Sequence, residues 1–329
     1  MHIRDIRALK QTASERLASV DQAKNIVLVY GGITIGLSAL VTIVNYIAGT
    51  EISNFGGLSN IGIRSFLSTI QTILPMLQSV LLLCLEFGYL NAMLRISRGQ
   101  YASVRSLKMG VDRFWSVLRL TLLQGFLYLG ILMLSVYSAI QLFLVTPFSN
   151  DVMALAGQFV NETDPMAMMD EATYLALSDA IMPLFPIWGL VFAALFLPVF
   201  YQYRLTSYIL VDNPQMRSMM ILRESHALMK RNRLNLFRLD LSLWWYFLLT
   251  LLAAAACYGD LLLPLVGITF PWSDTVGYFL FYGIYLVLEL IIFYLFLNKV
   301  SVTYALAYQS LCPEKKEDNA VVLGNIFQM

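Results

Sequence analysis

Long apolar segments alternate with shorter polar segments along the whole chain. Six of the apolar segments are long enough to cross the roughly 30 Å of hydrocarbon in a bilayer, which takes about 20 helical residues. They lie near residues 26–48, 68–94, 114–145, 180–210, 236–267 and 276–307. The pattern predicts an all-α polytopic membrane protein, with a six-helix transmembrane domain at 25–311, an amphipathic segment at 1–24 and a tail at 312–329.

Basic residues predict how these helices are oriented. Every Lys and Arg except Arg64 falls in the N-terminal segment, in residues 95–119 and 204–238, or from Lys299 onward. The segment between the third and fourth spans, 146–179, holds acidic residues and no basic one. Flanks rich in Lys and Arg stay on the cytoplasmic side of a membrane. Both termini, and the amphipathic N-terminal segment, are therefore predicted to be cytoplasmic.

Composition argues against several classes of protein. With 58% hydrophobic and 13% charged residues, the chain has more apolar side chains than a soluble core buries. No basic domain with interleaved aromatic residues lies outside the spans, so a nucleic-acid partner is not expected. The chain has no P-loop, no paired-histidine motif and no Gly-x-Ser-x-Gly sequence, and its cysteines lack metal-type spacing. Neither an enzymatic activity nor a metal or cofactor is therefore expected.

A second cytoplasmic amphipathic helix is predicted at 214–231. Asp212 or Asn213 suits its N-cap, and Pro214 suits its first position. Helical spacing places four residues on one face: Met219, Leu222, His226 and Met229. Three charged residues fall on another face, where we expect them to dock a protein partner: Arg217, Glu224 and Arg231.

Two segments suggest an internal repeat. Residues 112–122 enter the third span and residues 231–241 enter the fifth, and both end in Arg-Leu-Thr/Asp-Leu. The N-terminal segment has the same layout, which favours a three-fold repeat of helical hairpins, each preceded by a cytoplasmic amphipathic helix. The alternative is that any helix crossing a cytoplasmic interface begins with basic residues followed by apolar ones.

Two acidic residues interrupt the apolar spans. Glu86 precedes Arg95 by nine residues and Glu289 precedes Lys299 by ten, which puts both carboxylates roughly 14 Å from the cytoplasmic boundary. A bare carboxylate at this depth costs at least about 2.5 kcal/mol, so each should face the bundle interior, a partner or water. Six further residues complete a predicted substrate or coupling site in the inner half of the membrane: Gln78, Tyr285, Arg119, Arg204, Arg238 and Asp240.

Two features leave alternatives open. The arginines of this site also suit snorkelling to the headgroups, with the two glutamates making structural hydrogen bonds to Tyr or Gln. In the fourth span, Pro198 is predicted to be a hinge, because proline removes a backbone hydrogen bond inside a helix. Pro183 and Pro186, in contrast, can occupy the first helical turn without a kink.

Several short stretches carry a resemblance to a known family. They are LEFGY at 85–89, RISRG at 95–99, ILVDNP at 209–214, SHALMK at 225–230 and LFRLDLS at 236–242. Their order and composition resemble an uncharacterised bacterial integral membrane family, the domain-of-unknown-function family numbered 975. Family members typically place Gly after the Met-Lys pair, where this chain has Arg231 and Asn232. The resemblance implies a multi-pass protein of the bacterial inner membrane, and it implies no activity or catalytic residue.

Three hypotheses about function follow. The first is a transporter-like or export-associated protein that acts on an amphipathic substrate, a lipid or a peptide, through a polar cavity in the inner leaflet. The second is a non-catalytic scaffold or accessory subunit that docks a protein partner at the cytoplasmic face. The third, an intramembrane lipid-modifying enzyme, rests only on the buried acids. Membrane lipids are expected partners in all three.

Overall fold

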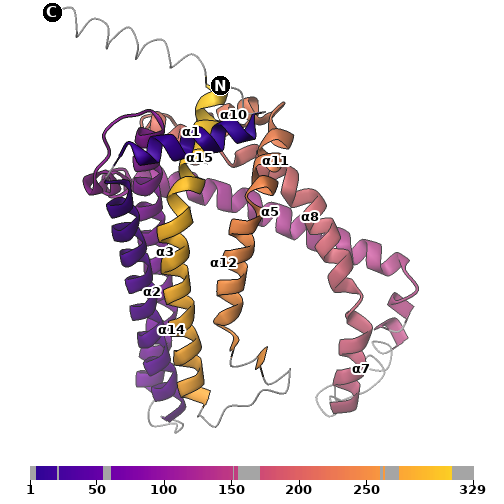
Figure 1. Ribbon diagram of the computed structural model, residues 1–329. Coiled ribbons are helices and arrows are strands. Elements are labelled where there is room, and N and C mark those ends of the chain that lie inside the picture. Colours follow the sequence, from indigo (N-terminus) through magenta and orange to yellow (C-terminus); the bar gives the residue numbers. More distant parts are fainter. Residues whose placement is uncertain are drawn as a thin grey trace, which may run out of the picture. The chain divides into compact units, whose positions relative to one another are not determined.

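The computed structural model describes residues 5–20, 22–54, 61–150, 152–154, 171–259, 262–263 and 274–312 (Figure 1). Within these ranges every regular element is a helix, so the all-α prediction is confirmed. The predicted tail beyond Cys312 lies outside the described residues.

Helices make up nearly all of the described residues. In chain order they are α1 (Ile6–Ala18), α2 (Ala23–Asn54), α3 (Ile61–Ser97), η2 (Val104–Lys108), α4 (Met109–Asp112), α5 (Phe114–Val145), α7 (Glu171–Ile181), α8 (Leu184–Tyr203), α9 (Thr206–Asp212), α10 (Ser218–Met229), α11 (Arg233–Ser242), α12 (Trp244–Ala256), α14 (Asp274–Ile292), η3 (Phe293–Leu297) and α15 (Asn298–Leu311). The η2 segment is a 3₁₀ helix, and η3 is a π-helical segment that joins α14 to α15.

Five helical segments are long and apolar enough to cross a membrane, and there are up to six spans if α11 and α12 count as one. The five are Ala23–Ile52, Gly62–Ser97, Phe114–Val145, Ser178–Asp212 and Thr275–Leu311. Each contains one of the predicted spans, because a run of about 20 apolar residues has few other ways to hide its surface. The chain is thus a multi-pass membrane protein by length and composition of its helices.

The predicted fifth span, 236–267, is not one straight helix. A 61° bend separates α11 from α12. Lys10 Nζ of α1 donates a hydrogen bond of 2.6 Å to the carbonyl oxygen of Ser242 at the bend. On α11, Asp240 Oδ1 accepts a hydrogen bond of 2.5 Å from Tyr304 Oη of α15. Polar contacts from two other helices thus join α11 near its C-terminal end, and the last four residues of the predicted span, 264–267, lie outside the described residues.

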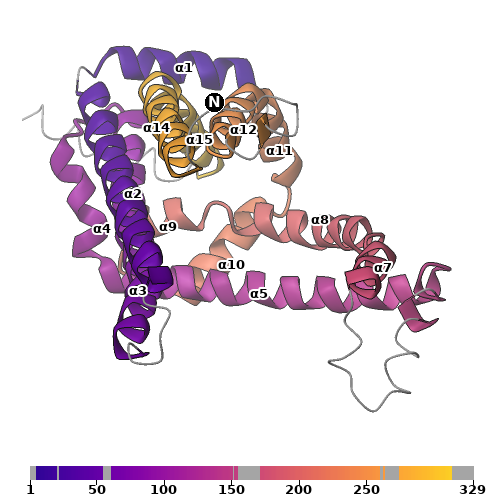
Figure 2. The same cartoon turned by 90° about the horizontal axis from the view of Figure 1, so that it is seen from below.

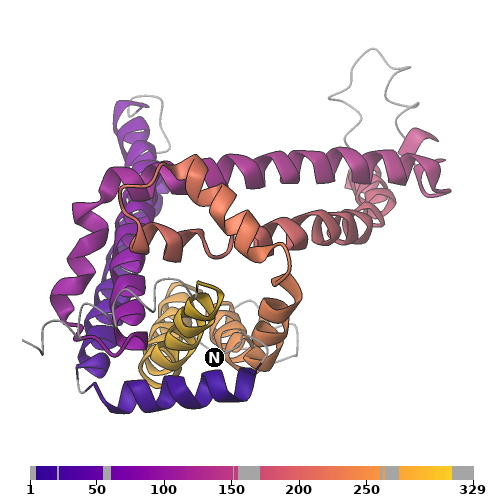
Figure 3. The same cartoon turned by 90° about the horizontal axis from the view of Figure 1, so that it is seen from above.

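The described chain forms two compact units. The larger unit comprises Met1–Leu118 and Leu205–Met329, and the smaller unit is Arg119–Arg204. In the larger unit α2 and α3 pack side by side along their length, α14 lies beside α2, and α12 lies beside α14 (Figure 2). The short α1 crosses one end of this unit against α15 (Figure 3).

Two glycines bring α3 and the η2–α4 segment into backbone contact. A Cβ atom on Gly88 of α3 would overlap the backbone of Leu107 in η2. A Cβ atom on Gly110 of α4 would overlap the backbone of Cys84 in α3. Small residues permit such close approach between membrane helices. The two contacts fix η2 and α4 against the last third of α3.

The smaller unit is held by aromatic packing. Four aromatic residues at four-residue spacing stack along α8: Trp188, Phe192, Phe196 and Phe200. Tyr128 of α5 packs against Phe196, and Trp188 Nε1 donates to Ser135 Oγ of α5 at 3.2 Å. This spacing follows from the helical period, which puts residues four apart on one face.

The amphipathic helix predicted at 214–231 is shorter in the structure. It begins at Ser218, with Arg217 in extended conformation at the N-cap, and ends at Met229. Its buried residues are Ile221, Leu222, Ser225 and Met229, whereas Met219 and His226 are exposed. The predicted face was therefore partly wrong, because Ile221 and Ser225 pack inward in place of Met219 and His226.

Candidate functional site

The two intramembrane glutamates lie on different helices of the larger unit and share one neighbour. Glu86 is on α3 and Glu289 is on α14. Both carboxylates are within electrostatic range of the hydroxyl of Tyr30 on α2. The structure thus places two residues that are 203 positions apart in the sequence on helices that both pack against α2.

Tyrosines surround this pair. Tyr285 lies one turn before Glu289 on α14, and its side chain interacts with the Glu289 carboxylate. Tyr246 of α12 is also within electrostatic range of Glu289. Tyr30 stacks on Tyr89 of α3, with ring centroids 4.5 Å apart. We call Glu86, Glu289, Tyr30, Tyr89, Tyr246 and Tyr285 the carboxylate–tyrosine cluster.

The cluster has a chemistry that the surrounding apolar side chains lack. Each carboxylate offers acceptor oxygens, and each tyrosine hydroxyl can donate to an anion or accept from a cation. Glu86 is exposed in the isolated chain and Glu289 is half-buried. Each carboxylate can hold a proton, a cation or an amine.

A π-helical segment follows the cluster directly. Residues Phe293–Leu297 form η3, which starts one turn after Glu289. Phe293 stacks against Tyr30, with centroids 6.1 Å apart, and touches Gly31, so α2 packs against the irregular turn. Isolated π turns in helices often mark functional sites. The sequence gives no signal for this turn, and it was not predicted.

A buried polar contact closes the cluster at its other end. Tyr89 Oη donates to Asn298 Oδ1 at 2.9 Å, and Asn298 Nδ2 donates to the carbonyl oxygen of Ala23 at 2.9 Å. All three residues are buried. Satisfied buried polar groups make an arrangement specific, because an alternative packing leaves them unpaired. This contact joins α3, α15 and the start of α2.

An ion pair outside the carboxylate–tyrosine cluster was not predicted from the sequence. Arg98 Nη2 donates to both carboxylate oxygens of Asp212, at 2.6 and 2.8 Å. Tyr308 Oη donates to Asp212 Oδ2 at 3.0 Å and stacks on Tyr208. The sequence pattern predicts Asp212 only as a possible helix cap. A signal did exist, because the two stretches that hold the partners, 95–99 and 209–214, are among those that carry the family resemblance.

Other predicted site residues have different surroundings. Gln78 Nε2 donates to Ser38 Oγ at 3.0 Å, which places it in the contact between α2 and α3. Asp240 binds Tyr304 on α15, and Arg238 is exposed on α11. Arg238 and Asp240 both lie in α11, and the 61° bend separates them from the apolar helix α12.

Arg119 and Arg204 are the first and last residues of the smaller unit. Arg119 is exposed on α5. The guanidinium carbon of Arg204 lies 5.3 Å from the ring centroid of Phe200 and 5.7 Å from that of Tyr201, a cation–π arrangement. Pro198 lies inside α8, which continues through it to Tyr203.

The residues predicted to dock a partner lie in or near α10. Arg217 is exposed at the N-cap, Glu224 is half-buried in the helix, and Arg231 is exposed beyond its end. Arg217 also lines a shallow groove of about 640 Å³ together with residues 212–216 and Met220.

Among the described residues, no group of three or more His, Cys, Asp or Glu side chains is arranged to hold a metal ion. No curated protein and no solved structure matches the chain. The model of the family described as "Protein of unknown function (DUF975)" matches residues 1–310, which include both intramembrane glutamates, the π-helical segment and the Arg98–Asp212 pair. The chain therefore belongs to this family.

Proposed function

We propose that the protein is a transporter-like or export-associated membrane protein that acts on an amphipathic substrate, a lipid or a peptide. The substrate or coupling site is the carboxylate–tyrosine cluster. One observation carries the proposal: Glu86 and Glu289 come from separate apolar helices that both pack against α2, and each acts electrostatically on Tyr30 of α2. A protein pays a desolvation cost for each such carboxylate, and intramembrane acids typically serve ion or substrate pathways.

The proposal includes a placement in the membrane. The protein lies in the bacterial inner membrane with both termini in the cytoplasm, and the hairpins repeat with cytoplasmic amphipathic helices. The distribution of Lys and Arg supports this placement. Single cysteines introduced at Arg7 and at Glu51, after replacement of the native cysteines, test it in intact cells. A membrane-impermeant thiol reagent should label position 51 alone, and labelling of position 7 would reverse the orientation.

The chemistry of the cluster allows proton binding to be coupled to substrate movement. A carboxylate that alternates between protonated and charged forms changes the free energy of any bound cation or amine nearby. The chain has no ATP-binding motif, so the energy for active movement would come from an ion gradient or a separate ATPase. The two acids lie on separate helices, α3 and α14, which both pack against α2.

The test is native mass spectrometry of protein released gently from its own membrane. Wild-type protein should retain a lipid or peptide, and Glu86→Gln and Glu289→Gln should each reduce its occupancy. Glu51→Gln is the matched control, since Glu51 is a carboxylate near the far end of α2. Equal occupancy in all four proteins would disprove the assignment of the site. The identified compound would then be used in a liposome uptake assay with and without a proton gradient.

A second candidate function has one specific observation in its favour. The groove beside α10 carries exposed Met220 and Arg217, and Met side chains adapt to varied partners. In this alternative, the protein is a non-catalytic scaffold that docks a protein subunit at its cytoplasmic face. Affinity purification of wild type and an Arg217→Ala, Glu224→Ala, Arg231→Ala variant distinguishes it. A stoichiometric subunit lost in the variant supports docking, and identical recoveries contradict it.

A further inference from the structure

Three arginines converge on one cavity of the larger unit, away from the carboxylate–tyrosine cluster. The cavity has a volume of about 410 Å³. The cavity is lined by Arg95 from the last turn of α3, Arg105 from η2 and Arg113 between α4 and α5, together with Asn91, Ser106 and Asp112. Such a volume is within the range of small-molecule sites.

The positive charge of this cavity is not neutralised within the described part of the chain. None of the three arginines makes an ion pair with a described carboxylate. The single acid of the lining, Asp112, has its carboxylate 3.8 Å from Lys108 Nζ. Three guanidinium groups around one space repel each other, so an anion between them lowers the energy of the arrangement.

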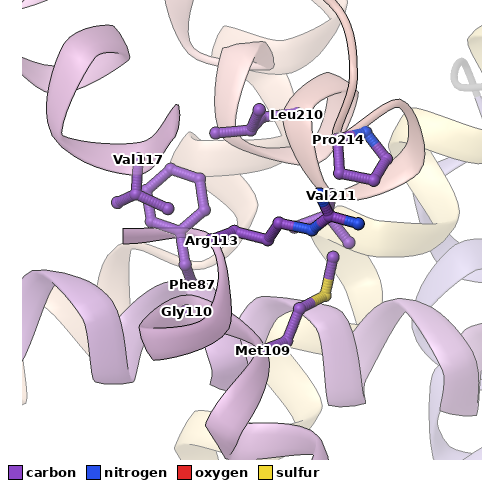
Figure 4. Close-up of a pocket in the computed structure, with 8 residues that line it drawn as sticks. All are labelled: Phe87, Met109, Gly110, Arg113, Val117, Leu210, Val211 and Pro214. Atoms are coloured by element: carbon purple, nitrogen blue, oxygen red, sulfur yellow. The ribbon is translucent and has the colours of Figure 1, made fainter. Parts of the chain in front are cut away.

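The backbone that carries the arginines is fixed. The close approaches at Gly88 and Gly110 hold η2 and α4 against α3, as described above. Arg113 is half-buried, and Figure 4 shows its side chain crossing an apolar crevice formed with Phe87, Val117 and Leu210, its guanidinium pointing toward Pro214. The crevice is nearly filled, with a free volume of about 10 Å³, so the arginine stem has little room to move.

The position of the cavity limits the ligand. Arg95 ends one membrane-spanning helix and Arg113 immediately precedes the next. The ends of such helices lie at the depth of the lipid headgroups. Guanidinium groups bind phosphate and carboxylate oxygens through paired hydrogen bonds, which a halide cannot accept in this way. At the depth of the headgroups, phosphate is the anion that the lipids themselves supply.

We propose that Arg95, Arg105 and Arg113 form a binding site for a phosphate group, carried either by an anionic lipid headgroup or by a soluble phosphate compound. The site goes beyond the proposed transport function and does not depend on it, since its residues are separate from Glu86 and Glu289. A general attraction of surface arginines to anionic membranes predicts no dependence on these three residues above other exposed arginines.

The experiment measures lipid binding by native mass spectrometry of detergent-purified full-length protein. Phosphatidylglycerol is titrated against wild type, Arg95→Gln, Arg105→Gln, Arg113→Gln and the triple variant. Arg7→Gln and Arg223→Gln are controls, because both arginines are exposed and neither lines the cavity. Each cavity variant should weaken binding at least tenfold, and the controls should change it less than twofold. Arg113→Lys keeps the positive charge but loses the planar guanidinium that can donate two parallel hydrogen bonds to phosphate. An affinity between those of wild type and Arg113→Gln is therefore expected.

Competition identifies the source of the phosphate. Glycerol 3-phosphate or inorganic phosphate at millimolar concentration should leave phosphatidylglycerol bound if the site takes a lipid, and should displace it if the natural ligand is soluble. Both results support a phosphate site. Equal binding of phosphatidylglycerol by cavity and control variants would overturn it. The elution volume and melting temperature of each variant are measured alongside, and Arg113→Lys provides the comparison if a Gln variant does not fold.

Discussion

The Arg98–Asp212 ion pair should contribute strongly to the stability of the larger unit. The Asp212 side chain is 4% exposed and that of Arg98 is 27% exposed, and two nitrogen–oxygen contacts of 2.6 and 2.8 Å join them. Removing one partner of a fully buried pair costs about 3–5 kcal/mol, and an exposed pair contributes about 0–1 kcal/mol. Because Arg98 is partly exposed, we expect Arg98→Gln to lower the free energy of unfolding by about 2–3 kcal/mol.

A double-mutant cycle isolates the pair itself. Asp212→Asn keeps an oxygen that can accept from Tyr308 and leaves Arg98 able to reach water, so it should cost about 1 kcal/mol. The double variant removes both charges, and the coupling energy between the two positions should be about 2 kcal/mol. The assay is unfolding of the protein in dodecyl maltoside by titrated sodium dodecyl sulfate at pH 7, followed by tryptophan fluorescence.

The chain offers a matched control for this cycle. Lys108 and Asp112 form a 3.8 Å pair whose side chains are 75% and 56% exposed. The same cycle with Lys108→Gln and Asp112→Asn should give a coupling energy below about 0.5 kcal/mol. If the Arg98–Asp212 cycle gave a value as small as this, burial would not be what makes the pair strong, and the reasoning would be refuted.

Three further predictions concern other contacts of the larger unit. Gly88→Ala should destabilise by about 2–3 kcal/mol because its Cβ would overlap the Leu107 backbone, whereas Gly32→Ala, with open space around it, should be neutral or stabilising in the same unfolding assay. Asn298→Leu should cost about 3 kcal/mol, since it leaves the Tyr89 hydroxyl and the Ala23 carbonyl unpaired, and Tyr89→Phe should cost only about 1 kcal/mol. Burial and the charge of Lys299 lower the pKa of Lys10, so stability should rise with pH between that folded pKa and the ordinary value of 10.5. Lys299→Gln should raise the pKa of Lys10, which is measured by NMR titration of the reductively methylated lysines. If the substitution leaves this pKa unchanged, repulsion between Lys10 and Lys299 is excluded as a cause of the shift.

The membrane helices could be predicted from the sequence because their signal is local. The predicted spans at 26–48, 68–94 and 114–145 all fall inside helices of the structure, since hydropathy and the helical period act within each segment. The bend at Leu243 could not be predicted in this way. At the bend, the carbonyl oxygen of Ser242 accepts a hydrogen bond from Lys10, which lies 232 residues earlier in the sequence.

The candidate site could be predicted only in part, for a related reason. An acid in an apolar run is conspicuous, so Glu86 and Glu289 were found. Arg98 and Asp212 each lie at the end of a helix, where a charge has an ordinary explanation as a flank or a cap. Their pairing spans 114 residues and becomes visible only when α3 and α9 are placed together. The π turn depends on backbone geometry that Phe293–Leu297 do not encode recognisably.

Under the proposed function, we expect motion on the Glu289 side of the cluster and not on the Glu86 side. Just beyond Glu86, α3 is fixed by the Gly88 crossing and by the hydrogen bond of Tyr89 to Asn298, whereas the π turn separates Glu289 from α15. Conversion of one π turn to α geometry rotates the preceding helix by about 100° relative to the following one. A substrate-driven change should therefore alter the distance between spin labels at exposed Ile284 of α14 and Ile43 of α2. Labels at Ile43 and Leu77 of α3 should keep a single distance, and movement of this second pair instead would place the mobile element on α3.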